Sequence, residues 1–245
     1  EALIAYFDLD RSLWHQYLAY LRGVVSGEFG LSFVDRRPVT TVVAERLWPS
    51  GQLLLASVAL TIAVSLPLGV LAAVHRRSWI GSAIMVVAFT GYAVPSFVLA
   101  IVMVLTFSYW LNWLPVVGNG TWQHFIMPTI AMAGVLIAAL TRFTRNAMLG
   151  VLGQDFIRTA RAKGLSRRQA LWRHGVRNAL IPVLTIIGLQ FSFLIAGAII
   201  IENVFFLPGL GRLVFQGITQ RDLIVVESVV MLLIFAVILV NFLVD

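Results

Sequence analysis

The chain has 245 residues, of which 60% are hydrophobic and only 12% are charged, and its mean hydropathy is +0.92. Soluble domains carry about a quarter charged residues, so this composition excludes an ordinary soluble globular protein and indicates a membrane protein. The formal net charge of +7 does not require nucleic-acid binding, because basic loops beside apolar spans fix orientation in a membrane and meet anionic lipid.

Residues 1–50 are mixed in character and are predicted to form an amphipathic region outside the cytoplasm. Apolar side chains recur there at helical spacing at Trp14, Tyr17, Leu18, Leu21 and Val25. Such a helix suits a membrane surface, and packing against neighbouring helices is the alternative that stays open. A second short helix is expected from residue 38 to residue 47, ahead of Pro49.

Residues 51–245 are predicted to form an all-α, polytopic transmembrane helical bundle. A spanning helix needs about 20 apolar residues, and five segments fit or nearly fit: 52–74, 79–111, 125–141, 179–201 and 223–244. Pro67 and Pro95 predict kinks inside two spans. The third span is expected to continue as a helix past Arg142 and Arg145, and the fourth to carry Pro182 in its first turns.

The basic segment 150–178 is predicted to form two short helices joined by a bend. Asp155 is expected at the start of the first helix, where a carboxylate meets free N–H groups. Gly164 is expected to end that helix in the left-handed conformation. Ser166 and Gln169 form the S-x-x-Q pattern of a capping box, which predicts the start of the second helix.

The distribution of basic residues predicts the orientation of the spans. If the spans alternate, one side holds Arg76, Arg77, Arg142, Arg145, Arg158, Arg161, Lys163, Arg167, Arg168, Arg173 and Arg177. The other side holds Arg11, Arg22, Arg36, Arg37, Arg46, Arg212 and Arg221, partly balanced by acids. Segment 150–178 is therefore predicted to be cytoplasmic and segment 202–222 external. Because residues 1–50 would then lie outside with no span before them, one further span is expected upstream. The full-length protein is therefore expected to have six spans.

No catalytic or metal-binding constellation is recognisable in the sequence. The four histidines are far apart, there is no cysteine, and the only lysine, Lys163, does not follow a glycine-rich nucleotide loop. We therefore expect a non-enzyme without a cofactor or metal of its own. The cores of the predicted spans also lack ionisable groups, which weakens the alternative of a stand-alone secondary transporter or channel.

Several motifs together resemble one transporter family over nearly the whole chain. They are LDRSLWHQYL, FGLSF-x3-RPV, LPLGVLAAV, VPSF, LNWLPVVG, WQHFIMP, RTARAKGLS, RHGVRNALIPVLT and IIENVFFLPGLGR. This set resembles the permease subunits of ABC importers of the dipeptide, oligopeptide and nickel type. In the general importer-permease signature, Glu-Ala-Ala is followed by any three residues and then by a glycine. Here Arg158, Thr159 and Ala160 take the first three places and Gly164 is the glycine. The Ile-x-Leu-Pro that comes later in the signature is absent.

The resemblance implies a multi-pass permease of the bacterial inner membrane, with a coupling helix that docks on an ATPase. The coupling residues would be Asp155, Arg158, Thr159, Ala160, Arg161, Ala162, Lys163 and Gly164. The implied partners are a second permease chain, two ATPase subunits that hold ATP and Mg, and an external substrate-binding protein. Di- or oligopeptides are the expected cargo; nickel chelates, glutathione and opines stay open.

Two further groups of candidate residues follow from the resemblance. The external gate or docking surface would use Glu202, Asn203, Phe205, Phe206 and Arg212. A packed loop with internal ion pairs is an equally good interpretation for each of them. The translocation path would be lined by Ser96, Gln190 and Ser192, although hydrogen bonding between helices is the commoner use of such residues in membranes.

Overall fold

The computed structural model describes residues 12–244, apart from the side chains of Tyr20 and Arg167, and this part of the chain is almost entirely helical. The elements are α2 (Leu13–Ser26), α3 (Val39–Val74), α4 (Trp79–Ala93), α5 (Ser96–Met103), η1 (Val104–Trp110, π-helical), α6 (Gln123–Leu152), α7 (Asp155–Ala162), α8 (Arg167–Ala170), η2 (Leu171–Val176, π-helical), α9 (Arg177–Val204), α10 (Leu210–Gln220) and α11 (Leu223–Val244). The predicted all-α fold is confirmed. Residues 1–11 of the predicted 1–50 region, Arg11 included, lie outside the described range.

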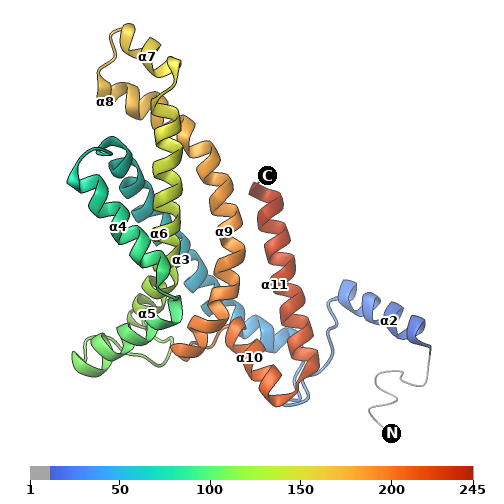
Figure 1. Cartoon of the computed structure of the whole chain (residues 1–245). Helices are drawn as coiled ribbons and strands as arrows, with labels where there is room; N and C mark the ends of the chain where they lie inside the picture. Colours follow the sequence, from blue (N-terminus) through green and yellow to red (C-terminus); the bar gives the residue numbers. More distant parts are fainter. Residues whose placement is uncertain (1–11, 245) are drawn as a thin grey trace.

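Four helices in the described part of the chain are long and apolar enough to cross a membrane: α3, α6, the continuous helix Arg168–Val204, and α11. Helix α4 and the α5–η1 helix would together make a fifth, broken span. In Figure 1, α9 lies between α6 and α11, and both of these helices contact it. The predicted multi-pass helical bundle is thus confirmed, and the last span has the predicted bounds.

The N-terminal part of α3 differs from the prediction of a separate short helix before Pro49. One helix of 36 residues runs from Val39 to Val74 and contains both Pro49 and Pro67. A proline inside a helix removes one backbone hydrogen bond. Burial on both sides of Pro49 maintains the helix, since Val42 packs with α10 and α11 while Leu53 belongs to the main core cluster.

The kink predicted at Pro95 is a complete break. Helices α4 and α5–η1 meet at 96°, and Figure 1 shows the second of them turning away from the bundle. Val94 is extended, with φ −84° and ψ 119°, as expected for a residue whose helical conformation would clash with the ring of the following proline. The single helix expected from residue 79 to residue 111 is therefore wrong.

Helix α6 lies at the centre of the fold. It contacts α3, α4, α5 and α9, and Met127, Ala131 and Met132 from its first half are part of the main core cluster. The prediction that it continues past Arg142 and Arg145 is confirmed, since it ends at Leu152. At Gly69 of α3 an added Cβ would clash with the Thr144 side chain, so glycine is what lets α3 and α6 approach so closely.

The second half of the basic segment is not a separate short helix. From Arg168 to Val204 the chain forms one continuous helix of 37 residues, which contains the six-residue π-helical segment η2. Pro182, expected in the first turns of a span, therefore lies well inside this helix. π-Helical turns such as η2 are rare and occur mostly as single-turn bulges inside α-helices, frequently at functional sites.

Helix α2 is the predicted amphipathic helix, and its apolar side chains are not covered by the rest of the described chain. Trp14 is 69% exposed and Val25 is 89% exposed. Figure 1 shows α2 standing apart from the bundle. Within residues 12–244, no neighbouring helix covers this stripe, so the membrane surface and packing against helices of another chain stay open as alternatives.

Candidate functional site: coupling hairpin, external corner and transmembrane pocket

The hairpin formed by α7, Gly164 and α8 projects from the ends of α6 and α9 (Figure 1). Its caps are those that the sequence predicts. Gly164 has φ +92°; its N–H donates to the carbonyl of Arg161 at 3.0 Å, and the N–H of Leu165 donates to the carbonyl of Ala160 at 3.2 Å. These two bonds form a Schellman motif, which requires a left-handed residue at the position of the glycine.

The capping box at the start of α8 is complete. The Ser166 N–H donates to Gln169 Oε1 at 2.9 Å, and the Gln169 N–H donates to Ser166 Oγ at 3.3 Å. The two helix ends that face each other across the bend are therefore both closed by local hydrogen bonds. A bend fixed at both ends can transmit a force as one rigid unit.

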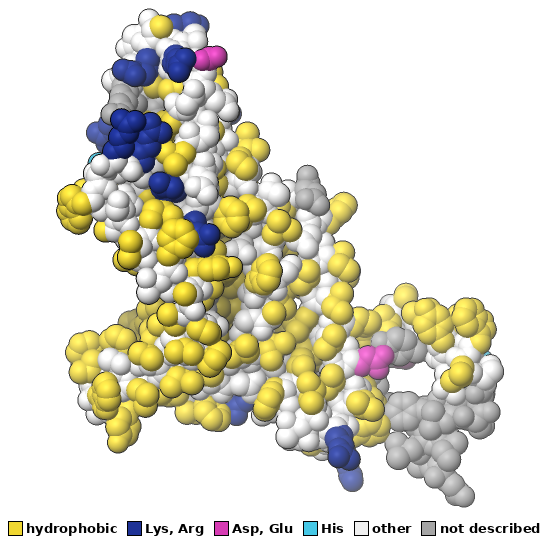
Figure 2. Space-filling view, viewed as in Figure 1, with side chains coloured by type: hydrophobic (Ala, Val, Ile, Leu, Met, Phe, Trp, Pro, Cys, Tyr) yellow, Lys and Arg dark blue, Asp and Glu magenta, His cyan; other side chains and the backbone are white. Residues whose placement is uncertain are grey.

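The predicted coupling residues lie on two faces of α7. Ile157 and Ala160 are buried, at 7% and 8% exposure, so the small side chain of Ala160 serves packing within this chain. The exposed members of the set are Asp155, Arg158, Thr159, Arg161, Ala162, Lys163 and Gly164. Asp155 pairs with Arg158 at 3.4 Å, an exposed contact of little energetic weight. Figure 2 shows Lys and Arg side chains gathered over this end of the molecule.

Segment 202–222, which is predicted to be external, is a packed corner that contains helix α10, and it is not an open loop. The carboxylate of Glu202, which is 1% exposed, accepts hydrogen bonds from Ser50 Oγ and from the Arg212 N–H at 3.0 Å. Ser50 Oγ in turn accepts a hydrogen bond from the Leu210 N–H at 2.7 Å. The buried carboxylate thereby caps the N-terminus of α10, where the helix dipole favours negative charge.

Glycines make room for this carboxylate. A Cβ at Gly209 would clash with the Glu202 carboxylate, and one at Gly211 would lie 2.5 Å from the Cα of Ile199. The Pro208-Gly209 turn is thus the place where α10 packs directly against α9. Ser50, which joins α3 to this cluster, was not recognised in the sequence, because only the fold brings it near Glu202.

The five residues predicted for the external gate separate into buried and surface positions. Phe205 is fully buried, like Glu202, and Asn203 donates to the carbonyl of Ile199 within its own helix at 2.7 Å. Phe206 is 49% exposed. The Arg212 guanidinium lies 4.9 Å from its ring and donates to its carbonyl at 2.6 Å. Phe206 and Arg212 therefore offer the surface that a partner can reach.

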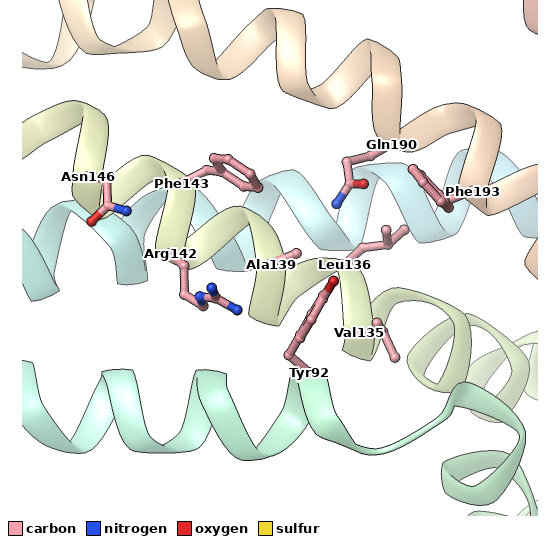
Figure 3. A pocket seen from close by; sticks show the side chains of 9 residues that line it. All are labelled: Tyr92, Val135, Leu136, Ala139, Arg142, Phe143, Asn146, Gln190 and Phe193. Carbon is pink, nitrogen blue, oxygen red and sulfur yellow. The ribbon is translucent and has the colours of Figure 1, made fainter.

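A pocket of about 400 Å³ lies between α4, α6 and α9. Figure 3 shows Tyr92 pointing from α4 toward α6, and Gln190 pointing from α9 into the space between the helices. The lining residues are Tyr92, Val135, Leu136, Ala139, Arg142, Phe143, Asn146, Gln190 and Phe193. An adjoining hollow shares Tyr92 and Phe193 and includes Ser96. Of the three predicted path residues, Gln190 lines the first hollow and Ser96 the second, and Ser192 lines neither.

Arg142 lines this pocket with its guanidinium beside two aromatic rings of α4. The guanidinium lies 4.5 Å from the Phe89 ring centre and 5.2 Å from that of Tyr92. Arg142 directly follows the predicted span 125–141 and lies ten residues before Leu152, where α6 ends.

The expectation that the cores of the predicted spans lack ionisable groups stays a prediction, because Arg142 comes directly after the span 125–141. Each cation–π contact stabilises the guanidinium by about 0.5–2 kcal/mol. In the sequence, Arg142 ends the uncharged run from residue 78 to residue 141. Its two ring contacts depend on the packing of α4 against α6, which the sequence alone does not show.

Residues 65–245 match the family described as "Binding-protein-dependent transport system inner membrane component". The glutathione transport system permease protein GsiC of Escherichia coli strain K12 is 41% identical over 237 residues, which cover 97% of this chain and 78% of that protein. GsiC of Shigella dysenteriae serotype 1 is 41% identical over the same share of each chain.

Solved structures with the same fold come from two ABC transporters. A chain of the MetNI methionine ABC transporter in inward-facing conformations aligns with a TM-score of 0.68 and 20% identity, covering 83% of this chain and 93% of that one. A chain of an amino acid ABC transporter crystallised with histidines aligns with a TM-score of 0.62 and 16% identity, covering 84% and 92%. At these identities the likeness shows the fold alone. The family match and the identity to GsiC show that the chain belongs to the inner membrane permease components of binding-protein-dependent ABC importers.

Proposed function

We propose that this permease forms a translocation path with a second, homologous permease chain and imports short peptides at the expense of ATP. Two separate ATPase subunits bind and hydrolyse the ATP with Mg, and an external binding protein delivers the cargo. The permease itself carries no catalytic residues and no cofactor. Its task is to convert movement of the ATPases into alternate opening of the path to either side of the membrane.

The observation that carries the proposal is the hairpin with both of its bend-facing helix ends capped. Helix α7 begins directly after α6, and α8 continues into α9, so a force on the hairpin reaches two of the helices that line the transmembrane pocket. An exposed basic surface at that end (Figure 2) suits docking against another protein. A secondary transporter or channel would leave this rigid projection without a role.

The cargo is proposed from the relatives and from chemistry together. Glutathione, the cargo in the name of GsiC, is itself a tripeptide, so glutathione and other short peptides form one chemical class. Opines share its carboxylates and amines. A nickel ion is chemically different from all of these, which makes it the informative competitor in a transport experiment.

The test is ATPase activity of the complete assembly in proteoliposomes, with the partner permease, both ATPases and the binding protein present. We expect the binding protein loaded with a short peptide to stimulate hydrolysis and to drive peptide uptake. If only a nickel-loaded binding protein stimulates hydrolysis, the proposed importer mechanism holds and the cargo is nickel instead of a peptide. An assembly that contains no ATPase, or one that never responds to the binding protein, would contradict the proposal.

A further inference from the structure

The Arg142 guanidinium packs beside two aromatic rings, at 4.5 Å from the ring centre of Phe89 and 5.2 Å from that of Tyr92. Within the described residues it has neither a carboxylate partner nor a hydrogen-bond acceptor, and the side chain borders the pocket between α4, α6 and α9. This half-buried cation thus borders a space that a ligand can enter.

The lining of this pocket also carries uncharged groups that can both donate and accept hydrogen bonds. Figure 3 shows the amide of Gln190 entering from α9 and the amide of Asn146 lying one turn beyond Arg142 on α6. Phe143 and Phe193 supply apolar surface between them. One cation, two amides and aromatic walls are a suitable set for a small solute with a carboxylate, an amide group and an apolar side chain.

We propose that Arg142 binds the carboxylate of the cargo during its passage through the membrane, and that this permease therefore selects carboxylate-bearing solutes. This inference rests on the proposed function. The planar guanidinium pairs with a carboxylate in bidentate geometry, and the pairing is strong only where water is largely excluded. A free divalent cation meets repulsion at the same point, so the pocket disfavours nickel as an uncomplexed ion.

The surroundings of Arg142 suit a transient site. A carboxylate that enters the pocket loses part of its hydration, and a cation that lines the pocket compensates for part of this loss. The aromatic rings hold the guanidinium in place without neutralising it, because they carry no net charge. The cation therefore remains available each time the cargo has left.

The experiment compares uptake of a labelled dipeptide with uptake of its C-terminal amide in proteoliposomes of the complete assembly. Each peptide is supplied at a concentration that saturates the binding protein, and uptake is expressed per ATP hydrolysed. We expect the wild type to favour the free acid. Arg142→Gln should lower free-acid uptake roughly tenfold to hundredfold, the range for one charge-assisted hydrogen-bonded pair, and abolish the preference over the amide. Arg142→Lys should recover part of the uptake.

Arg77→Gln is the matched control, since Arg77 is an exposed arginine in the turn between α3 and α4, and it should transport like the wild type. Free-acid uptake at the wild-type level in Arg142→Gln would overturn the inference. Loss of the second permease chain on purification of that variant would also overturn it, because Arg142 would then pair with a carboxylate of that chain. A failure of the proposed function gives a different result: the ATPase activity of the wild-type assembly would then not increase when the loaded binding protein is added.

Discussion

At the scale of single residues, the permease uses polar side chains in two different ways. At the corner formed by α3, α9 and α10, the buried carboxylate of Glu202 accepts hydrogen bonds from α3 and α10, so it stabilises one arrangement of three helices. In the pocket between α4, α6 and α9, the half-buried Arg142 lies beside two aromatic rings. Glu202 thus fixes structure, whereas Arg142 is the group for which we propose a ligand.

The corner predicts a contrast between two buried serines of the same helix. Ser50→Ala removes the donor to Glu202 and the acceptor for the Leu210 N–H, which should cost about 1–3 kcal/mol for buried groups left unpaired. Ser65→Ala should cost little, because Ser65 Oγ has no hydrogen-bond partner in the described structure. Thermal unfolding of the purified permease in detergent measures both variants. Equal losses would show that the corner does not hold α3, α9 and α10 together.

At the scale of elements, Gly164 is the residue on which the shape of the coupling hairpin depends. Gly164→Leu places a side chain in the left-handed region, at about 1–2 kcal/mol, yet a Cβ there would meet nothing within 4 Å in this chain. The variant should therefore insert normally, lose uptake and lose stimulation of the ATPase. Coupled ATPase activity and uptake in proteoliposomes measure the effect.

Gly150→Leu is the comparison for that variant. Gly150 also has open space around its Cβ position but lies in regular helix within α6, so a side chain there causes no backbone strain. It should leave coupling intact. If both variants couple like the wild type, α7 is not the element that docks on the ATPase.

The exposed apolar stripe of α2 predicts that this helix lies in the surface of the membrane. The chain has no cysteine, so a single engineered one carries a spin label at a defined site. A label at Val25→Cys, on the stripe, should be accessible to oxygen in lipid. A label at Ala19→Cys, which lies about 120° from Val25 around the helix axis, should be accessible to a water-soluble relaxation agent. Electron paramagnetic resonance in proteoliposomes measures both. Equal exposure of the two labels to water would exclude a membrane-surface helix.

At the scale of the whole molecule, the sequence predicted what depends on neighbouring residues. The Gly164 cap, the Ser166–Gln169 box and the bounds of α11 follow from local chemistry and a continuous apolar run. The break at Pro95 was expected only as a kink, because its angle of 96° is set by what α5 packs against. The Ser50–Glu202 contact and the contacts of Arg142 with Phe89 and Tyr92 were not predictable, since residues far apart in the chain create them.

Which loops lie on the same side of the membrane depends on whether α4 and α5 together cross it as one broken span or form a re-entrant loop. The last prediction tests this. If the broken pair crosses the membrane as one span, Arg77→Cys and Gly153→Cys lie in the cytoplasm and Gly120→Cys lies outside. A membrane-impermeant maleimide should then label Gly120→Cys in intact spheroplasts, and the other two variants only after the membrane is permeabilised. The natural chain, without cysteine, reports the background. Protection of Gly120→Cys in intact spheroplasts would mean that α4 and α5 enter and leave on one side. The excess of arginines at residues 142–177 would then no longer agree with an alternating set of spans.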